Sequence, residues 1–202
     1  MTKPVLIGLT GYAGTGKDTV RKLLEQKHDF DGIAFADPIR DMLGALLDSM
    51  EIPRDWMIER ELKEREIPRL GVSYRQMAQA LGTEWGRSLN SSLWLDIAAT
   101  KIAACNQYGN PGVVISDVRF ANEAEWIKAQ GGLIWKIIRP DVEPVREHVS
   151  EDLVASLPYD YVIDNRSTVE NLAMAVDSAL VYCLKIPPNM LQFVGTATET
   201  QP

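Results

Sequence analysis

The chain has 202 residues, of which 46% are hydrophobic and 24% are charged, so it can bury the core of one ordinary globular domain. Its formal net charge of −7 would repel a phosphodiester backbone, which argues against a broad nucleic-acid-binding surface but leaves small phosphate ligands open. The apolar stretch near the N-terminus is too short for a secretion signal, and no run reaches the ~18 apolar residues of a membrane span. We therefore expect a cytoplasmic protein whose two cysteines, Cys105 and Cys183, are buried thiols rather than disulfide or zinc ligands.

The first predicted elements are a strand, a glycine-rich loop and a helix. The apolar run over residues 4–10 is typical of the centre of a parallel sheet, and residues 18–28 carry apolar side chains at helical spacing. Between them, residues 11–17 read GYAGTGK and satisfy the pattern G-x-x-x-x-G-K. Glycines let successive N–H groups surround an anion, and the lysine can reach the terminal phosphates. The loop therefore predicts a site for a nucleoside triphosphate.

The end of this loop departs from the usual pattern. Asp18 stands where the common motif has a hydroxyl residue, and Thr19 supplies the hydroxyl one position later. The resulting G-K-x-T resembles nucleoside monophosphate kinases of the adenylate-kinase group, in which the threonine contacts phosphate and much of the magnesium shell is water. Asp18 could orient such waters, or it could be only a favourable carboxylate in the first helical turn.

The middle of the chain is predicted to be mostly helical after a short strand over 32–36. Apolar periodicity and capping signals indicate helices over 37–50, 74–89 and 92–105, and the segment over 54–66 is charged and amphipathic. Asp37 is expected as the N-cap of the first, with Pro38 in its first turn, and Ser73 with Gln76 as a capping box of the third.

The rest of the chain alternates strands and helices around one polar excursion. The predicted strands are 112–117, 133–139 and 159–165, and the predicted helices are 121–130 and 167–184, the latter with a capping box of Ser167 and Glu170. We expect an α/β three-layer P-loop NTPase fold with a parallel sheet of about five strands flanked by helices. The resemblance to nucleoside monophosphate kinases implies one kinase domain over 1–186, with a helical acceptor-binding region over about 37–105 and a lid over about 140–158, and the tail over 187–202 is expected to be loose.

Two charged residues at the end of a predicted strand are candidates for the acceptor site. Asp117 and Arg119 follow the strand over 112–117, at the edge of the sheet where the phosphate loop ends. A guanidinium can form two parallel hydrogen bonds to a monophosphate. Asp117 could hold a metal-bound water or orient that arginine, and a plain strand-end salt bridge is the alternative for both residues.

Other candidates have a structural alternative as well. Arg75 lies in the first turn of its predicted helix, which is unfavourable unless an anion is near, although it could be solvated. Gly82, beside Thr83, destabilises a helix by about 1 kcal/mol relative to alanine. Its presence therefore indicates either close approach of a ligand or plain packing. Trp94 could stack on a base or belong to the core, and Glu123 could face the acceptor or solvent. The charged run over 54–66 is more typical of a solvated face.

Beyond the loop, motifs from residue 5 to about 180 occur in the same order in phage deoxynucleoside monophosphate kinases. These motifs are GKDT, FADPIRD, YRQMAQALGTEWGR, ISDVRFANEAE, IIRP, HVSE and VIDNRSTVENL. The chain resembles this family, which implies an adenylate-kinase-like fold that uses ATP and Mg²⁺ to phosphorylate a deoxynucleoside monophosphate for DNA synthesis. The expected partners are small-molecule nucleotides, with neither nucleic acid nor membrane. A homodimer stays open, and the cytoplasm would be that of the host if a phage encodes the chain.

The motifs and the resemblance together imply a set of site residues. Those expected to bind ATP are Gly14, Thr15, Gly16, Lys17, Asp18, Thr19, Arg139 and Asn165. Those expected to bind the acceptor are Arg40, Arg75, Gly82, Thr83, Trp94, Asp117, Arg119 and Glu123. Lys17, Arg75 and Arg119 are expected to be catalytic. No direct metal ligand is assigned, and Asp18 or Asp117 could act through water.

The chain also differs from part of this family. In the T-even phage version the second helix starts Gly-Pro where this chain has Asp37 and Pro38, lysine replaces Arg40, and a long insertion precedes the segment corresponding to ALGT. The accepted base could therefore differ. Two alternatives for the function stay open, a P-loop kinase of another small acceptor such as dephospho-coenzyme A, and a nucleotide-binding switch without turnover.

Overall fold

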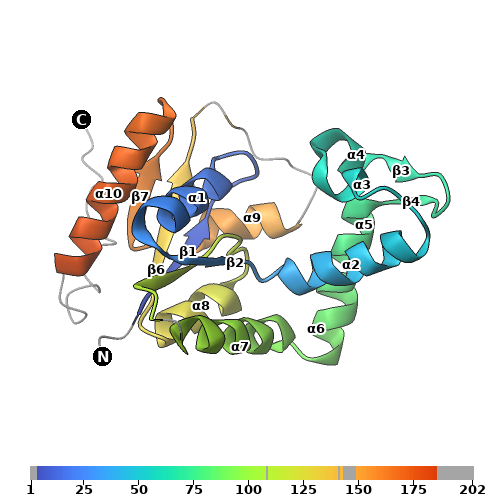
Figure 1. Ribbon diagram of the computed structural model, residues 1–202, viewed down its shortest axis with the longest axis horizontal. Helices are drawn as coiled ribbons and strands as arrows, with labels where there is room; N and C mark the ends of the chain where they lie inside the picture. Colours follow the sequence, from blue (N-terminus) through green and yellow to red (C-terminus); the bar gives the residue numbers. More distant parts are fainter. Residues whose placement is uncertain (1–3, 108, 141, 143–148, 186–202) are drawn as a thin grey trace. The chain divides into compact units, whose positions relative to one another are not determined.

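A parallel five-stranded sheet forms the centre of one of two compact units (Figure 1). The computed structural model describes residues 4–107, 109–140, 142 and 149–185. Unit 1 comprises the described residues up to Ile33 and from Lys101 onward, and unit 2 comprises Ala34–Thr100. The boundaries expected for a single kinase domain and its acceptor region stay a prediction, and the expected tail over 187–202 lies outside the described residues.

The strand order in unit 1 is β2-β5-β1-β6-β7, with every neighbouring pair parallel. The strands are β1 (Val5–Thr10), β2 (Asp31–Ile33), β5 (Gly112–Ile115), β6 (Leu133–Ile138) and β7 (Tyr161–Asp164). The chain begins at the central strand, adds two strands on one side of it and then two on the other. In such a sheet, ligands bind at the carboxyl edge where the order reverses, which here is the end of β1.

Helices cover both faces of this sheet. The helices of unit 1 are α1 (Lys17–His28), α8 (Ala121–Ala129), α9 (Val149–Ser156) and α10 (Val169–Lys185). Ile7 and Leu9 of β1 belong to one buried cluster with Val20 of α1 and with residues of α10. Gly8, between them in the strand, points the other way, because a Cβ there would lie 2.7 Å from Ile127 Cδ1 of α8. The predicted three-layer α/β fold is therefore confirmed.

Unit 2 is mostly helical, with one small hairpin. Its helices are α2 (Asp37–Ser49), α3 (Asp55–Ile58), α4 (Arg60–Glu64), α5 (Tyr74–Gln79), the π-helix η1 (Ala80–Trp85) and α6 (Gly86–Leu89). Helix α7 (Leu93–Gln107) begins in unit 2 and ends in unit 1. The hairpin pairs β3 (Glu66–Ile67) with β4 (Val72–Ser73).

The charged, amphipathic segment over 54–66 forms two short helices rather than one continuous helix. Glu59 is extended, with ψ 131°, and separates α3 from α4. None of the residues of these two helices, all of which the structure describes, is buried. Because short helices depend on tertiary packing, a charged run without a buried stripe gives only single turns. The hairpin of β3 and β4 was not predicted, because strands of two residues are too short to show a period.

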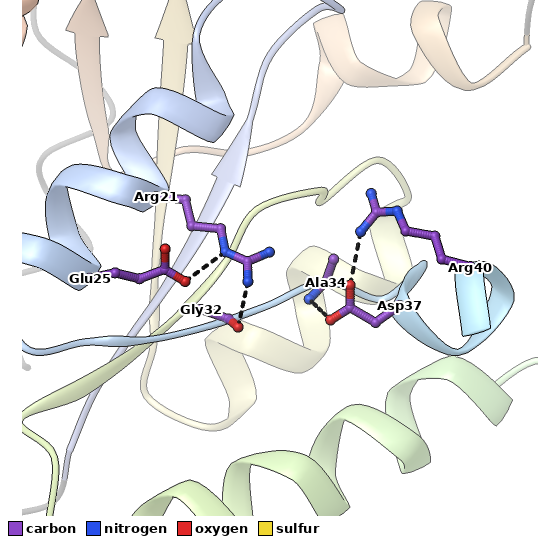
Figure 2. Close-up of polar contacts among 6 residues, drawn as sticks. All are labelled: Arg21, Glu25, Gly32, Ala34, Asp37 and Arg40. Atoms are coloured by element: carbon purple, nitrogen blue, oxygen red, sulfur yellow. Dashed lines mark hydrogen bonds and ion pairs between the residues drawn. The ribbon is translucent and has the colours of Figure 1, made fainter. Parts of the chain in front are cut away.

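The predicted caps are partly confirmed. Ser73 and Gln76 form the capping box, in which Ser73 Oγ accepts from Gln76 N at 3.1 Å and Gln76 Oε1 accepts from Ser73 N at 2.8 Å. Asp37 is the first helical residue of α2 rather than its N-cap, and its carboxylate accepts from Ala34 N at 2.8 Å (Figure 2). At the start of α10, Thr168 rather than Ser167 accepts from a backbone N–H. Such shifts by one residue are common at helix ends.

Two expectations concern the cysteines and the membrane. Cys105 and Cys183 are free but only half-buried, so the prediction of buried thiols is wrong. Partial burial raises the pKa of both thiols, which keeps them protonated near neutral pH. Among the described residues, no helix is long and apolar enough to cross a membrane.

Candidate active site

The phosphate loop over residues 11–17 joins β1 to α1 at the carboxyl edge of the sheet. Gly11, Gly14 and Gly16 have φ values of 142°, 84° and 101°, which residues with a Cβ rarely adopt. Gly11 also lies so close to β6 that a Cβ would be 2.4 Å from the carbonyl oxygen of Ile137. The glycine pattern is therefore required by the backbone of the loop itself.

Side chains of the loop bond to its own carbonyl groups. Thr15, which is buried, donates its hydroxyl to the carbonyl of Tyr12 at 2.9 Å. The ammonium of Lys17 donates to the carbonyl oxygens of Gly11 at 2.6 Å and Tyr12 at 2.7 Å. These bonds hold the lysine against the loop, where its charge can compensate that of a bound phosphate. In the first turn of α1, Asp18 is exposed and Thr19 is half-buried.

The segment after β5 is tied to the end of β1. Val118 donates its backbone N–H to the carbonyl of Leu9 at 3.1 Å, so Asp117 and Arg119 flank a residue that is anchored beside the start of the phosphate loop. Both side chains are half-buried. The structure therefore brings these two candidates to the same edge of the sheet as the loop.

Glu123 has a role that the sequence did not indicate. Its side chain is buried, and Oε2 accepts from the backbone N–H groups of Arg119 at 2.8 Å and Phe120 at 3.1 Å. The alternative of a solvent-facing glutamate is wrong. A carboxylate at this helix start satisfies N–H groups that the helix leaves unpaired. Glu123 therefore fixes the backbone of Arg119.

Arg139 and Asn165 follow the two strands on the other side of β1. Arg139 is exposed at the end of β6, and Asn165 donates from its side-chain Nδ2 to the carbonyl of Thr15 at 2.9 Å. A Cβ on Gly14 would lie 3.8 Å from Val142 Cγ1, so the predicted lid over 140–158 starts beside the loop. Part of that segment, 141 and 143–148, lies outside the described residues, and α9 accounts for its second half.

Two candidate arginines of unit 2 form exposed ion pairs. Arg75 Nε donates to Glu64 Oε1, so an anion of the chain itself faces this cation at the start of α5. Arg40 donates from Nη1 to Asp37 Oδ1 at 2.8 Å (Figure 2). Exposed pairs contribute little to stability, so either guanidinium can exchange its carboxylate for a phosphate at a small free-energy cost.

Gly82, Thr83 and Trp94 lie together in unit 2. A Cβ on Gly82 would be 2.8 Å from Ile39 Cδ1, so the glycine allows η1 to pack on α2. The indole N–H of Trp94 donates to the carbonyl of Gly82 at 2.8 Å. Trp94 is only 4% exposed and packs so tightly on Gly86 that a Cβ there would lie 2.2 Å from the ring. Trp94 therefore belongs to the core, which was one of the two alternatives for it, whereas its contact with an acceptor stays a prediction.

Thr83 lies on a π-helix that was not predicted. Residues 74–89 are helical as predicted, but six of them, Ala80–Trp85, are wound as a π-helix. π-Helices are rare and frequently occur at functional sites. The signal was Gly82 in a helical pattern, which indicated close approach of another group without showing which. Thr83 and its neighbour Glu84 are exposed on this segment.

The sheet and the loop together make a three-layer α/β P-loop fold, which solved structures share. TT1252 from Thermus thermophilus is 20% identical, with a TM-score of 0.50 over 90% of this chain and 98% of that chain. Shikimate kinase from Aquifex aeolicus is 15% identical, with a TM-score of 0.50 over 90% of this chain and 100% of that chain. At these identities the likeness shows the fold alone.

Sequence comparison gives the family. The sequence model of deoxynucleotide monophosphate kinase matches residues 57–176. A protein of Acanthamoeba polyphaga mimivirus, provisionally named a deoxynucleotide monophosphate kinase, is 32% identical over 196 residues, which are 87% of this chain and 96% of that protein. The deoxynucleoside-5'-monophosphate kinase of Escherichia phage T5 is 26% identical over 247 residues, covering 85% of this chain and 94% of that protein. The chain belongs to the deoxynucleotide monophosphate kinase family and is a phosphotransferase.

Proposed function

We propose that this chain transfers the terminal phosphate of ATP to a deoxynucleoside 5'-monophosphate, and so supplies nucleotides for DNA synthesis. The observation that carries the proposal is the anchoring of the segment of Asp117 and Arg119 at the end of β1, where the phosphate loop begins. A cation at that place suits transfer between phosphate groups. The reaction would take place in the cytoplasm, that of the host cell for a phage-encoded chain.

The phosphate loop is our proposed ATP site. Its N–H groups and the start of α1 would bind the phosphates, with Lys17 neutralising charge on the phosphoryl group that moves. Arg139, exposed after β6, would add a cation from the segment that begins the lid. The ATP contacts we propose are those of Gly14, Thr15, Gly16, Lys17, Asp18, Thr19, Arg139 and Asn165.

Magnesium fits the oxygen donors of this edge of the sheet. Thr19 offers a hydroxyl, and Asp18 and Asp117 offer carboxylates that need not bind the metal directly, because Mg²⁺ usually keeps several waters. When bound, the ion would supply charge neutralisation on the phosphates. The exposure of Asp18 leaves room for a water between carboxylate and metal.

Each of the two units contributes residues to the proposed acceptor contacts, and each set is proposed separately. In unit 1, Arg119 would bind the acceptor phosphate, with Asp117 orienting that guanidinium or a metal-bound water, and with Glu123 holding the backbone of Arg119. In unit 2, the proposed acceptor residues are Arg40, Arg75, Gly82, Thr83 and Trp94. Arg75 would release Glu64 to bind phosphate, and we propose unit 2 as the acceptor-binding region.

The proposed reaction is a direct displacement. An oxygen of the acceptor phosphate attacks the γ-phosphorus of ATP, the bond from that phosphorus to the β,γ-bridging oxygen breaks, and ADP and a deoxynucleoside diphosphate form. The protein would contribute positioning and positive charge, which we assign to Lys17 and Arg119 because the loop and the segment that carry them lie at the same edge of the sheet. Closure of the proposed lid over 140–158 would exclude water and so limit hydrolysis of ATP.

An acceptor panel tests this proposal. ADP release is measured with ATP, Mg²⁺ and each of the common deoxynucleoside and ribonucleoside monophosphates, with dephospho-coenzyme A as the competing acceptor. We expect ADP release that depends on a deoxynucleoside monophosphate. Release with dephospho-coenzyme A alone would favour a kinase of another small acceptor, and no dependence on any acceptor would favour a nucleotide-binding switch.

A further inference from the structure

The side chain of Asn165 bonds to the phosphate loop, 150 residues earlier in the sequence. Its backbone N–H donates to the carbonyl of Ile138 at 2.8 Å, which extends the pairing of β7 with β6 by one residue. Its side-chain Nδ2 donates to the carbonyl oxygen of Thr15 at 2.9 Å. Because a carbonyl oxygen can only accept, the nitrogen of the amide must face the loop. The hydrogen bond of the backbone thus fixes the Cα of Asn165, and the hydrogen bond of Nδ2 fixes the end of its side chain.

Gly16 leaves the space that this amide occupies. A Cβ at Gly16 would lie 2.3 Å from Asn165 Nδ2, which is closer than any real contact. The φ of 101° at Gly16 is also one that residues with a Cβ rarely adopt. The last glycine of the motif therefore meets two demands, a backbone conformation and a close approach by the Asn165 side chain.

The bond to Thr15 orients the peptide unit that follows it. In a planar trans peptide, the carbonyl and the N–H of the next residue point in opposite directions. Since the Thr15 carbonyl points to Asn165, the Gly16 N–H points away from Asn165. N–H groups at this position of a phosphate loop are the donors that bind an anion, together with the start of the following helix.

We propose that Asn165 is a positioning residue for the phosphate loop, whose side-chain amide fixes the Thr15–Gly16 peptide so that the Gly16 N–H is held for a phosphate oxygen. This inference deepens the proposed ATP site and depends on it. It gives the side chain a role different from contact with adenine. Because the backbone N–H of Asn165 is hydrogen-bonded to Ile138, a contact of this backbone with the base would have to use the carbonyl.

The test is Asn165→Asp, which keeps the shape of the side chain and replaces the donor with an oxygen. Two binding constants are measured by calorimetry with Mg²⁺ present, one for ATP and one for inorganic tripolyphosphate, which has no base. Losing one hydrogen bond and placing two oxygens against each other should weaken both ligands by about 5- to 30-fold at pH 8. A contact with adenine would instead weaken ATP and leave tripolyphosphate unchanged, which would overturn the inference, as would wild-type affinity for both.

Two further measurements separate positioning from a general structural effect. Asn165→Leu has a similar volume and removes the donor without adding a charge, so it should also weaken both ligands. Wild-type affinity for both ligands in Asn165→Leu would contradict donation by this side chain. Asn171→Asp is the matched control, because its Nδ2 donates to Ser167 Oγ on the exposed start of α10, and it should bind both ligands normally. A loss in the control equal to that of Asn165→Asp would also overturn the inference.

The result for Asn165→Asp can be interpreted even if the proposed acceptor is wrong. Binding of tripolyphosphate requires no acceptor, so the effect of Asn165→Asp can be measured even if no deoxynucleoside monophosphate is phosphorylated. Conversely, if phosphorylation occurs and Asn165→Asp leaves tripolyphosphate binding unchanged, the inference fails while the proposed function stands.

Discussion

Trp94→Phe tests how the π-helix of unit 2 is held. The substitution keeps an aromatic ring and removes the indole N–H that donates to the carbonyl of Gly82 at 2.8 Å. A buried carbonyl left without its partner costs about 1–3 kcal/mol. The smaller ring leaves a cavity beside Gly86, which adds roughly 1 kcal/mol. The free energy of unfolding should therefore fall by about 2–4 kcal/mol.

The assay combines denaturant unfolding with steady-state kinetics. Thr83 lies on the π-helix that this bond holds, so the KM for the deoxynucleoside monophosphate should rise while the KM for ATP stays unchanged. Trp85→Phe is the matched control, because Trp85 lies on the same π-helix and is 47% exposed, and it should change stability by less than about 0.5 kcal/mol. Unchanged stability in Trp94→Phe, or a raised KM for ATP instead, would refute the reasoning.

Three further predictions concern unit 1. Glu123→Ala leaves two backbone N–H groups without their acceptor and should lower the free energy of unfolding by about 2–5 kcal/mol. Glu123→Gln should lower it less. Equal losses of the two variants in denaturant unfolding would argue against charge-assisted bonds. Arg119→Ala should weaken acceptor binding about 30-fold in calorimetry and leave ATP binding nearly unchanged, and the reverse pattern would give Arg119 to the ATP site. Hydrogen exchange over 149–158 should slow when a bisubstrate dinucleotide binds, and unchanged exchange would contradict a closing lid.

The elements of unit 1 could be predicted because local signals and packing agree there. The run over 4–10 is apolar because β1 is covered on both faces, and the glycines of the loop stand where the backbone needs positive φ. The short strand expected over 32–36 ends earlier, at Ile33. Ala34 and Phe35 are buried although they follow the strand, so hydrophobicity alone placed the boundary wrongly.

The candidate site could be predicted only as a set of residue types. No partner could be predicted for Trp94 or Asn165, because each bonds to a backbone carbonyl whose position depends on the fold, whereas the bonds of Glu123 are local. Glu123 and Asn165 bond to segments that the sheet places at its carboxyl edge. The π-helix also could not be predicted, because its residues keep helical periodicity and differ only in winding.

The most direct test of the central claim is the stoichiometry of products by mass spectrometry. The protein is incubated with Mg²⁺, ATP and a deoxynucleoside monophosphate that the panel shows to be accepted, and ADP and the deoxynucleoside diphosphate are quantified. Phosphoryl transfer predicts equal amounts of the two products, both reduced about 100-fold or more in Lys17→Met, which removes the ammonium held by the loop. ADP without the diphosphate, or undiminished transfer in Lys17→Met, would contradict the account.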